Sequence, residues 1–144
     1  MSKYISYEPI NIQQMVAEAH HHKAGAQVIF LGDVRNHHKG QSVDYLEYEA
    51  HEILAEESIA GILNDAKSKF NLHEAVCQHR VGKVEIAQTA VIVVTAASHR
   101  KEAYAANQYI IDRVKYEAPI WKKEFFSDGS SEWGANSEIQ NSAD

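Results

Sequence analysis

Two lysines on either side of a proline are the residues in this sequence whose types and spacing best suit chemistry. Lys115 precedes Ala118-Pro119, and Lys122 follows it. Proline lacks a backbone N–H and biases the residue before it towards extended geometry, so we expect Lys115 on the last turn of a helix and Lys122 on the next strand. Both amines can then face one point, where they would bind an anion or act as bases. The alternative is that Lys115 complements the helix C-terminus and Lys122 is a solvated surface charge.

Two other groups of basic residues suit an anion. Ser98-His99-Arg100 follows an expected strand and opens an expected helix, so backbone donors, the helix dipole and two side chains can converge there on a phosphate. Ser98 is the candidate N-cap of that helix. The alternative is a merely capped helix with a surface His and Arg. Arg35 lies just beyond another strand, beside a glycine-bearing loop, and its planar guanidinium suits a bidentate grip on phosphate.

The histidines and the single cysteine argue against a metal site or a catalytic thiol. The densest histidine groups are residues 20–22 and residues 37–38, and structural zinc sites need several converging ligands that usually include cysteines. Cys77 lies in an apolar-alternating stretch, so we expect it to be buried and inert. His79-Arg80 ends a strand, where a structural or interface role is favoured. Because no phosphate-loop or dinucleotide fingerprint is present either, we expect no metal and no cofactor.

The elements that must position these groups follow from the hydrophobic periodicity. In chain order, the pattern predicts a helix over 12–19, strands over 26–31 and 43–48 flanking a polar loop at 36–42, a helix over 53–70, strands over 75–81 and 89–95, a helix from 98 to before 119, and a strand over 120–126. Short connections between adjacent strands favour a two-layer α+β fold over a doubly wound parallel sheet. We therefore predict a mostly antiparallel sheet with two long helices.

Composition narrows the class of protein. The 144 residues, 44% apolar and 24% charged, suit one domain over residues 1–126, followed by a polar C-terminal arm over 127–144 whose composition is typical of disorder. The net charge of -6 argues against a nucleic-acid partner. The longest apolar run, residues 90–97, is too short to cross a bilayer, and the N-terminus does not resemble a signal peptide. We expect a cytoplasmic protein with no membrane contact.

Four short motifs stand in a fixed order between residues 25 and 126. They are Gly32-Asp-Val-Arg-Asn-His37, His79-Arg-Val-Gly82, Ser98-His-Arg100 and Val114-Lys-Tyr-Glu-Ala-Pro-Ile-Trp-Lys122. Together they resemble the large, catalytic subunits of molybdopterin synthases. The resemblance implies an α/β hammerhead-like fold and a sulfurtransferase of molybdenum cofactor biosynthesis, which converts cyclic pyranopterin monophosphate into molybdopterin by installing a dithiolene.

The same resemblance implies a protein partner and roles for individual residues. The partner would be a small ubiquitin-like subunit that carries sulfur as a thiocarboxylate on its C-terminal glycine, two of them flanking a dimer of large subunits as a heterotetramer. Lys115 and Lys122 would be catalytic, with Lys115 the more chemical of the two because partial burial at the edge of its helix favours a neutral amine. The implied substrate-binding residues are Asp33, Val34, Arg35, His99, Arg100, Lys115, Lys122, Lys123 and Glu124.

Helix geometry makes an independent case for a homodimer. Arg100 and Lys115 lie at opposite ends of one predicted helix, about 22 Å apart at about 1.5 Å per residue. One small pterin does not span that distance, so we expect His99 and Arg100 of one subunit to meet Arg35, Lys115 and Lys122 of another. The alternative is that the helix is broken between its two ends. Two other interpretations stay open: a non-catalytic module that docks a ubiquitin-like partner, and a phosphate-ester enzyme that works without a partner.

Overall fold

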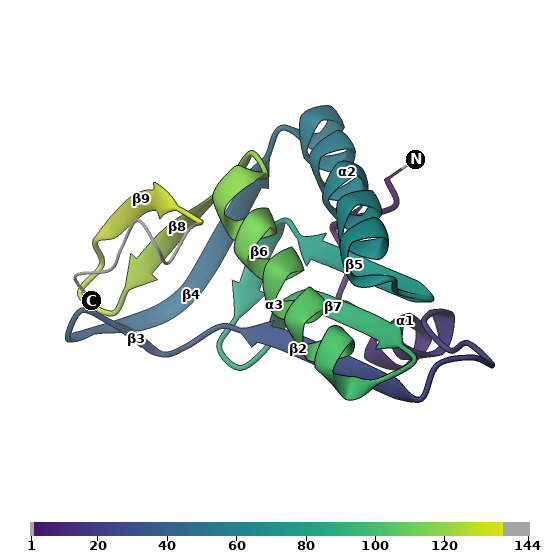
Figure 1. Ribbon diagram of the computed structural model, residues 1–144. Coiled ribbons are helices and arrows are strands. Elements are labelled where there is room, and N and C mark those ends of the chain that lie inside the picture. Colours follow the sequence, from purple (N-terminus) through teal and green to yellow (C-terminus); the bar gives the residue numbers. More distant parts are fainter. Residues whose placement is uncertain (1, 137–144) are drawn as a thin grey trace.

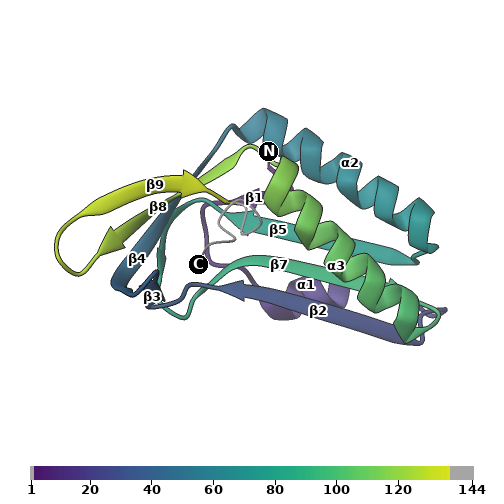
Figure 2. The same cartoon turned by 60° about the vertical axis from the view of Figure 1, so that its left-hand side comes forward.

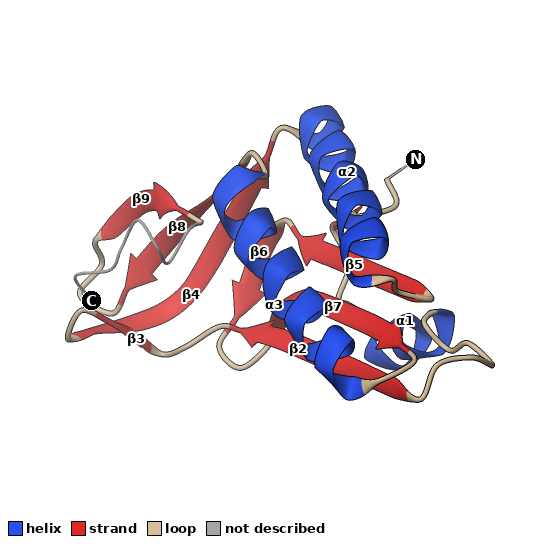
Figure 3. Ribbon diagram, in the orientation of Figure 1, coloured by secondary structure: helices blue, strands red, loops and turns tan. Residues whose placement is uncertain are grey.

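The computed structural model describes residues 2–136, which form an α+β protein with two β-sheets (Figures 1 and 3). In chain order the elements are β1 (Ile5–Ser6), α1 (Ile12–Glu18), β2 (Ala26–Asp33), β3 (His37–His38), β4 (Gln41–Ala50), α2 (Glu52–Phe70), β5 (Glu74–Arg80), β6 (Gly82–Glu85), β7 (Thr89–Ala97), α3 (Arg100–Glu117), β8 (Ile120–Phe126) and β9 (Ser131–Ala135). None of the helices in this part of the chain is long and apolar enough to span a bilayer.

The first sheet carries the main core. Its strand order is β1-β5-β7-β2, and β7 pairs antiparallel with both neighbours. Helices α2 and α3 cover one face, where Ile59 and Ile110 pack with Val93. Helix α1 packs on the other face of β7, through Met15 against Ile92. Because β7 is covered on both faces, it is buried almost throughout, which explains why its sequence is apolar except for Thr89 and Thr95.

The second sheet extends beyond the ends of β2 and α3 (Figure 2). Its order is β3-β4-β8-β9, with β6 also paired to β4. Helix α3 ends at Glu117, and its C-cap Ala118 has the extended backbone (φ -69°, ψ 133°) that Pro119 imposes on the residue before it. The chain then turns directly into β8. Lys115 is therefore on the last helical turn and Lys122 is on the following strand, as predicted.

The predicted fold class is confirmed, since the fold is α+β with two long helices and mostly antiparallel strands. The sequence did not predict a second sheet. The polar loop at 36–42 contains a tight hairpin between β3 and β4, in which Lys39 and Gly40 have φ of 50° and 79°. The polar arm contributes β9, which pairs along the edge of β8 through Ser131–Ala135. Residues 137–144 of that arm lie outside the described part of the chain.

Candidate functional site

A cavity of about 260 Å³ lies where the two sheets meet the end of α3. Its charged lining residues come from the end of β2, the last turns of α3 and β8, and they are Asp33, Arg35, Asp112, Lys115, Lys122 and Glu124. Apolar and aromatic side chains of Phe30, Leu46, Tyr48 and Ile111 form much of the remaining wall, to which Gly32, His37 and Ala90 also contribute. The structure thus brings together five of the residues predicted for the site, from segments up to about ninety positions apart.

A β-bulge at the end of β2 turns Asp33 and Arg35 into the cavity. The register between β2 and β7 shifts between Gly32 and Asp33, so the alternation that aims Phe30 and Gly32 at the cavity restarts at Asp33. Glycine is required at this position because a Cβ on Gly32 would lie 2.7 Å from a Val91 methyl group. Asp33 accepts a hydrogen bond of 2.8 Å from the Thr89 hydroxyl, which holds the carboxylate at the bulge.

Lys115 is held from the C-terminal arm. Its Nζ donates to Oδ1 of Asn136 at 3.3 Å, and Nδ2 of Asn136 lies 3.1 Å from Nε2 of His79. Nδ1 of His79 lies 2.7 Å from the carbonyl oxygen of Arg80, and the imidazole meets the Tyr48 ring edge-on at a centroid distance of 4.9 Å. Burial, with a further contribution from the positive charge of Lys115, lowers the pKa of His79 to about 3. His79 is therefore a neutral, buried, hydrogen-bonded residue.

Strand alternation separates the residues of β8 into two groups. Lys122 and Glu124 face the cavity, and the buried Glu124 carboxylate pairs with Nδ1 of His38 at 2.6 Å. Lys123 faces the opposite side, where its Nζ lies 5.1 Å from the centre of the Phe125 ring and 5.5 Å from that of Trp133. The structure therefore does not bring Lys123 to the cavity.

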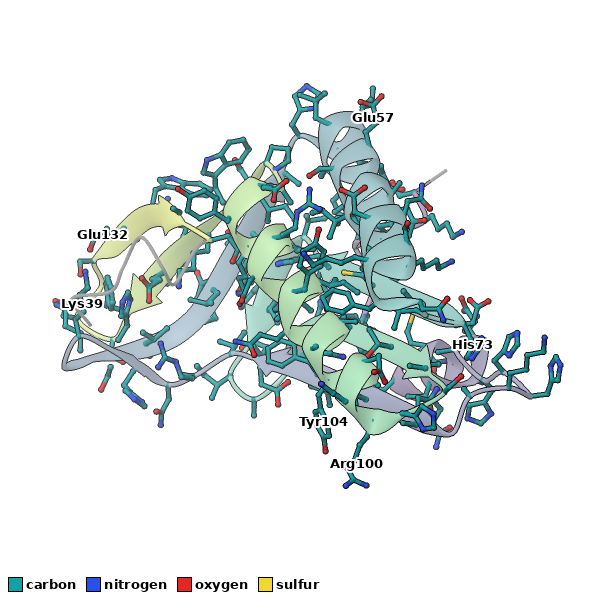
Figure 4. The ribbon with its side chains drawn as sticks, in the orientation of Figure 1. Lys39, Glu57, His73, Arg100, Tyr104 and Glu132 are labelled. Atoms are coloured by element: carbon teal, nitrogen blue, oxygen red, sulfur yellow. The ribbon has the colours of Figure 1, made fainter. Side chains whose placement is uncertain are left out.

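Three further residues predicted for the site lie elsewhere in this subunit. Val34 is buried in the core beside the cavity and does not line it. His99 and Arg100 are exposed at the start of α3, and Figure 4 shows Arg100 projecting from the end of the helix opposite to β8. Since α3 runs without a break from Arg100 to Glu117, the separation predicted between Arg100 and Lys115 holds.

The prediction that Ser98 caps α3 is wrong. The N-cap residue is His99, which makes no side-chain capping bond. The Ser98 hydroxyl instead pairs with Nε2 of His73 at 2.8 Å. The Ser98 hydroxyl therefore pairs with a residue distant in sequence and does not cap the helix.

Sequence reasoning missed Asn136, His38 and Asp112. Asn136 and His38 carry no local signal, because their partners are distant in sequence: His38 is 86 positions from Glu124. Asp112 lies three positions before Lys115, a spacing that places both on one helix face. Of the three missed residues, it is therefore the one that the sequence pattern could have identified.

A small groove adjoins the cavity and is lined by the β3–β4 hairpin and by strands β8 and β9. It has a volume of about 80 Å³ and shares Lys122 and Glu124 with the cavity. Lys39 and Glu132, labelled in Figure 4, lie at its outer end. Gly134 pairs with Lys122 across the two strands, and a Cβ at Gly134 would meet no atom within 4 Å. The missing side chain therefore leaves the groove open next to Lys122.

Neither a metal centre nor a reactive thiol is found among the described residues. Within residues 2–136, no three His, Cys, Asp or Glu side chains are grouped to hold a metal ion. Cys77 is buried as predicted, and burial raises the pKa of its thiol to about 12.

Comparisons with known proteins agree with one another. The family model described as MoaE protein matches residues 5–117. The molybdopterin synthase catalytic subunit of Bacillus subtilis is 38% identical over 125 residues, which are 87% of this chain and 80% of that protein. The crystal structure of molybdopterin synthase from Staphylococcus aureus superimposes with a TM-score of 0.87 at 39% identity, covering 92% of this chain and 96% of the other. A complex of subunits 1 and 2 of molybdopterin-converting factor from Helicobacter pylori, at 23% identity and a TM-score of 0.72, shares the fold over 91% of this chain and 88% of the other.

Proposed function

This chain belongs to the MoaE family of molybdopterin synthase catalytic subunits, and we propose how its cavity performs the reaction of that family. The substrate is cyclic pyranopterin monophosphate, and the product carries the dithiolene of molybdopterin. The observation that carries the proposal is the convergence of Lys115, Lys122 and Arg35 on one cavity, whose lining also includes aromatic and aliphatic side chains.

Arg35 and the two lysines form the anion-binding part of the cavity. Two of the acids beside them are engaged elsewhere, since Glu124 pairs with His38 and Asp33 accepts from Thr89. A guanidinium fork suits the cyclic phosphate, because it donates two parallel hydrogen bonds to two oxygens. The wall of Phe30 and Tyr48 suits the flat pterin. Arg35 would therefore orient the substrate so that the carbons of the pterin's side chain, which receive sulfur, face the two lysines.

Lys115 and Lys122 would then act on the sulfur transfer itself. Sulfur delivery from a thiocarboxylate forms a carbon–sulfur bond at a pterin side-chain carbon and breaks a carbon–oxygen bond at the same carbon, whose oxygen leaves as water or stays on the phosphate. Hydrolysis then breaks the bond between sulfur and the acyl carbon, with water supplying the carboxylate oxygen and its proton passing to a base. Attack of that water creates an oxyanion, which an ammonium group stabilises, and it requires a base. We assign the base to Lys115, whose amine is oriented by the amide oxygen of Asn136, and the oxyanion contact to Lys122, which also borders the groove.

The groove beside Gly134 suits the tail of the small carrier subunit. It is lined by the β3–β4 hairpin, β8 and β9, and it adjoins the cavity at Lys122 and Glu124. An extended chain ending in glycine is narrow enough to use a groove in which a strand residue lacks a side chain. The relative from Helicobacter pylori is named as a complex of two subunits of molybdopterin-converting factor, which supports a protein partner for this chain.

A homodimer through β2 would complete the site. Within residues 2–136 no strand pairs with the outer edge of β2, and Ile29 and Leu31 on this strand remain 44% and 37% exposed. Tyr104 on α3, 64% exposed, adds apolar surface at the same edge (Figure 4). An open, partly apolar strand edge is a template for pairing with a second copy.

Antiparallel pairing of two β2 strands about a two-fold axis would also bring the separated residues together. The first residue of β2, Ala26, pairs with Ala97 just before α3, whereas the last residue, Asp33, lines the cavity. The strand is about 23 Å long at about 3.3 Å per residue, which matches the rise of about 22 Å along α3. His99 and Arg100 of one subunit would thus approach the cavity of the other, and a carrier subunit at each groove would make a heterotetramer.

The test is turnover of cyclic pyranopterin monophosphate by the purified chain, with and without the thiocarboxylated small subunit. The proposal predicts molybdopterin only when the carrier is present. Tight complex formation without product would leave a docking module, and hydrolysis of a phosphate ester by the chain alone would favour the phosphate-ester enzyme. Either outcome would refute sulfur transfer.

A further inference from the structure

A buried chain of hydrogen bonds links the C-terminal arm to the amine of Lys115. Asn136 is only 3% exposed and His79 is fully buried, although both side chains are polar. Each is satisfied: His79 contacts the Arg80 carbonyl and Asn136, and Asn136 contacts His79 and Lys115. This row of hydrogen bonds thus begins at the carbonyl oxygen of Arg80 in β5, which is fixed in the core, and ends at the amine of Lys115, which lines the cavity.

The donor and acceptor properties of these groups determine the direction of each of the three hydrogen bonds. A carbonyl oxygen only accepts, so Nδ1 of His79 must carry the proton that faces Arg80. Because burial keeps the imidazole neutral, Nε2 of His79 is then an acceptor and the amide nitrogen of Asn136 must donate to it. The amide oxygen of Asn136 consequently faces Lys115, and it accepts a hydrogen bond from the lysine whether the lysine is an ammonium or a neutral amine.

We propose that His79 and Asn136 are positioning residues, which hold the amine of Lys115 at the point in the cavity where the sulfur transfer takes place. The proposal rests on the function assigned to the cavity above. A lysine has a long and flexible side chain, and an acceptor of fixed orientation limits where its nitrogen can lie. The acceptor comes from a segment beyond β9, so the polar arm is part of the catalytic apparatus.

A purely structural role would be served as well by apolar side chains of similar volume. Buried polar groups contribute little net stability even when every bond is made, and a matched apolar pair is often neutral or stabilising. In this protein, removal of the Asn136 amide would also remove an acceptor that orients Nζ of Lys115, so the position of the amine would be less restricted. Misplacement of a reacting group by about 1 Å lowers a rate by up to about 100-fold.

The experiment compares Asn136→Leu with Ser131→Ala, a change at an exposed position on the same arm. With the thiocarboxylated carrier, we expect Asn136→Leu to lower kcat by about 10- to 100-fold while KM for the pterin stays within about threefold. Ser131→Ala should keep both constants. Thermal unfolding of each variant shows whether the fold is retained.

A second pair of variants separates positioning from packing. Glutamine at position 79 can donate to the Arg80 carbonyl and accept from Asn136, whereas leucine can do neither. We therefore expect His79→Gln to recover most of the kcat that His79→Leu loses. Equal kcat in wild type and Asn136→Leu, or equal losses in the two His79 variants at equal stability, would overturn the proposal. Failure of the wild-type chain to form product would instead count against the proposed function.

Discussion

Mixing two inactive variants tests whether the site is shared between subunits. Arg100→Ala removes a group from the start of α3, and Lys115→Ala removes one from its last turn, so each homodimer should be inactive if both groups serve the same substrate. In a mixed dimer, one cavity combines the intact Lys115 of one subunit with the intact Arg100 of the other. The second cavity carries both defects.

The expected recovery follows from random assortment. An equal mixture that exchanges subunits contains about one half mixed dimers, as expected for a symmetric two-subunit assembly. Each mixed dimer has one intact site of two, so about one quarter of the wild-type activity should return. The assay is single-turnover formation of molybdopterin after subunit exchange, normalised to total chain.

A matched control uses two defects in the same cavity. Lys115→Ala mixed with Lys122→Ala leaves every cavity with one defect whichever way the subunits combine, and no activity should return. Recovery in this control, or no recovery from the Arg100 and Lys115 pair in a proven mixed dimer, would refute the composite site.

Further predictions concern the groove, the two faces of β8 and the buried histidine. Gly134→Val should raise KM for the carrier at least about tenfold with an unchanged melting temperature, because the new side chain enters open space in the groove and not the core; an unchanged KM would exclude this route for the tail. Lys123→Ala should keep turnover within about twofold while Lys122→Ala lowers it by about 100-fold, the size of effect found for an oxyanion donor; equal losses would contradict the assignment of the two faces. Because the pKa of His79 is low in the folded protein, below about pH 6.5 the unfolded chain binds a proton that the folded chain excludes. The contribution of His79 to the free energy of unfolding is therefore complete above that pH. It falls by about 1.4 kcal/mol per pH unit as the pH drops towards about 3. Denaturant titrations between pH 7 and 4 should show a smaller decline in His79→Gln, and an equal decline would refute this origin.

The part of the site that could be predicted from the sequence is the part encoded locally. Pro119 fixes the end of α3, and helical and strand periodicities then place Lys115 and Lys122 on either side of it. The separation of Arg100 from Lys115 follows in the same way from a continuous helix. Both predictions needed only neighbouring residues and a constant rise per residue.

Apart from Asp112, the features that were missed depend on pairing between distant segments. A glycine within a strand is consistent with a bulge, but only the register against β7 shows that the alternation restarts at Asp33. Strand β9 has few apolar side chains and is held by backbone bonds to the edge of β8, so hydrophobic periodicity carries no trace of it. Asn136 follows that strand, and its role depends on contacts with His79 and Lys115 from two other elements.

The most direct test of the central claim follows an isotopic sulfur label from the thiocarboxylate of the carrier to the pterin. The measurement compares wild type with Lys115→Ala and with the surface control Lys67→Ala, at carrier concentrations that saturate each complex. The account predicts transfer of label in wild type and Lys67→Ala, and a transfer rate reduced by at least about 100-fold in Lys115→Ala with unchanged carrier affinity. Normal label transfer in a saturated, folded Lys115→Ala complex would contradict a catalytic role for this cavity.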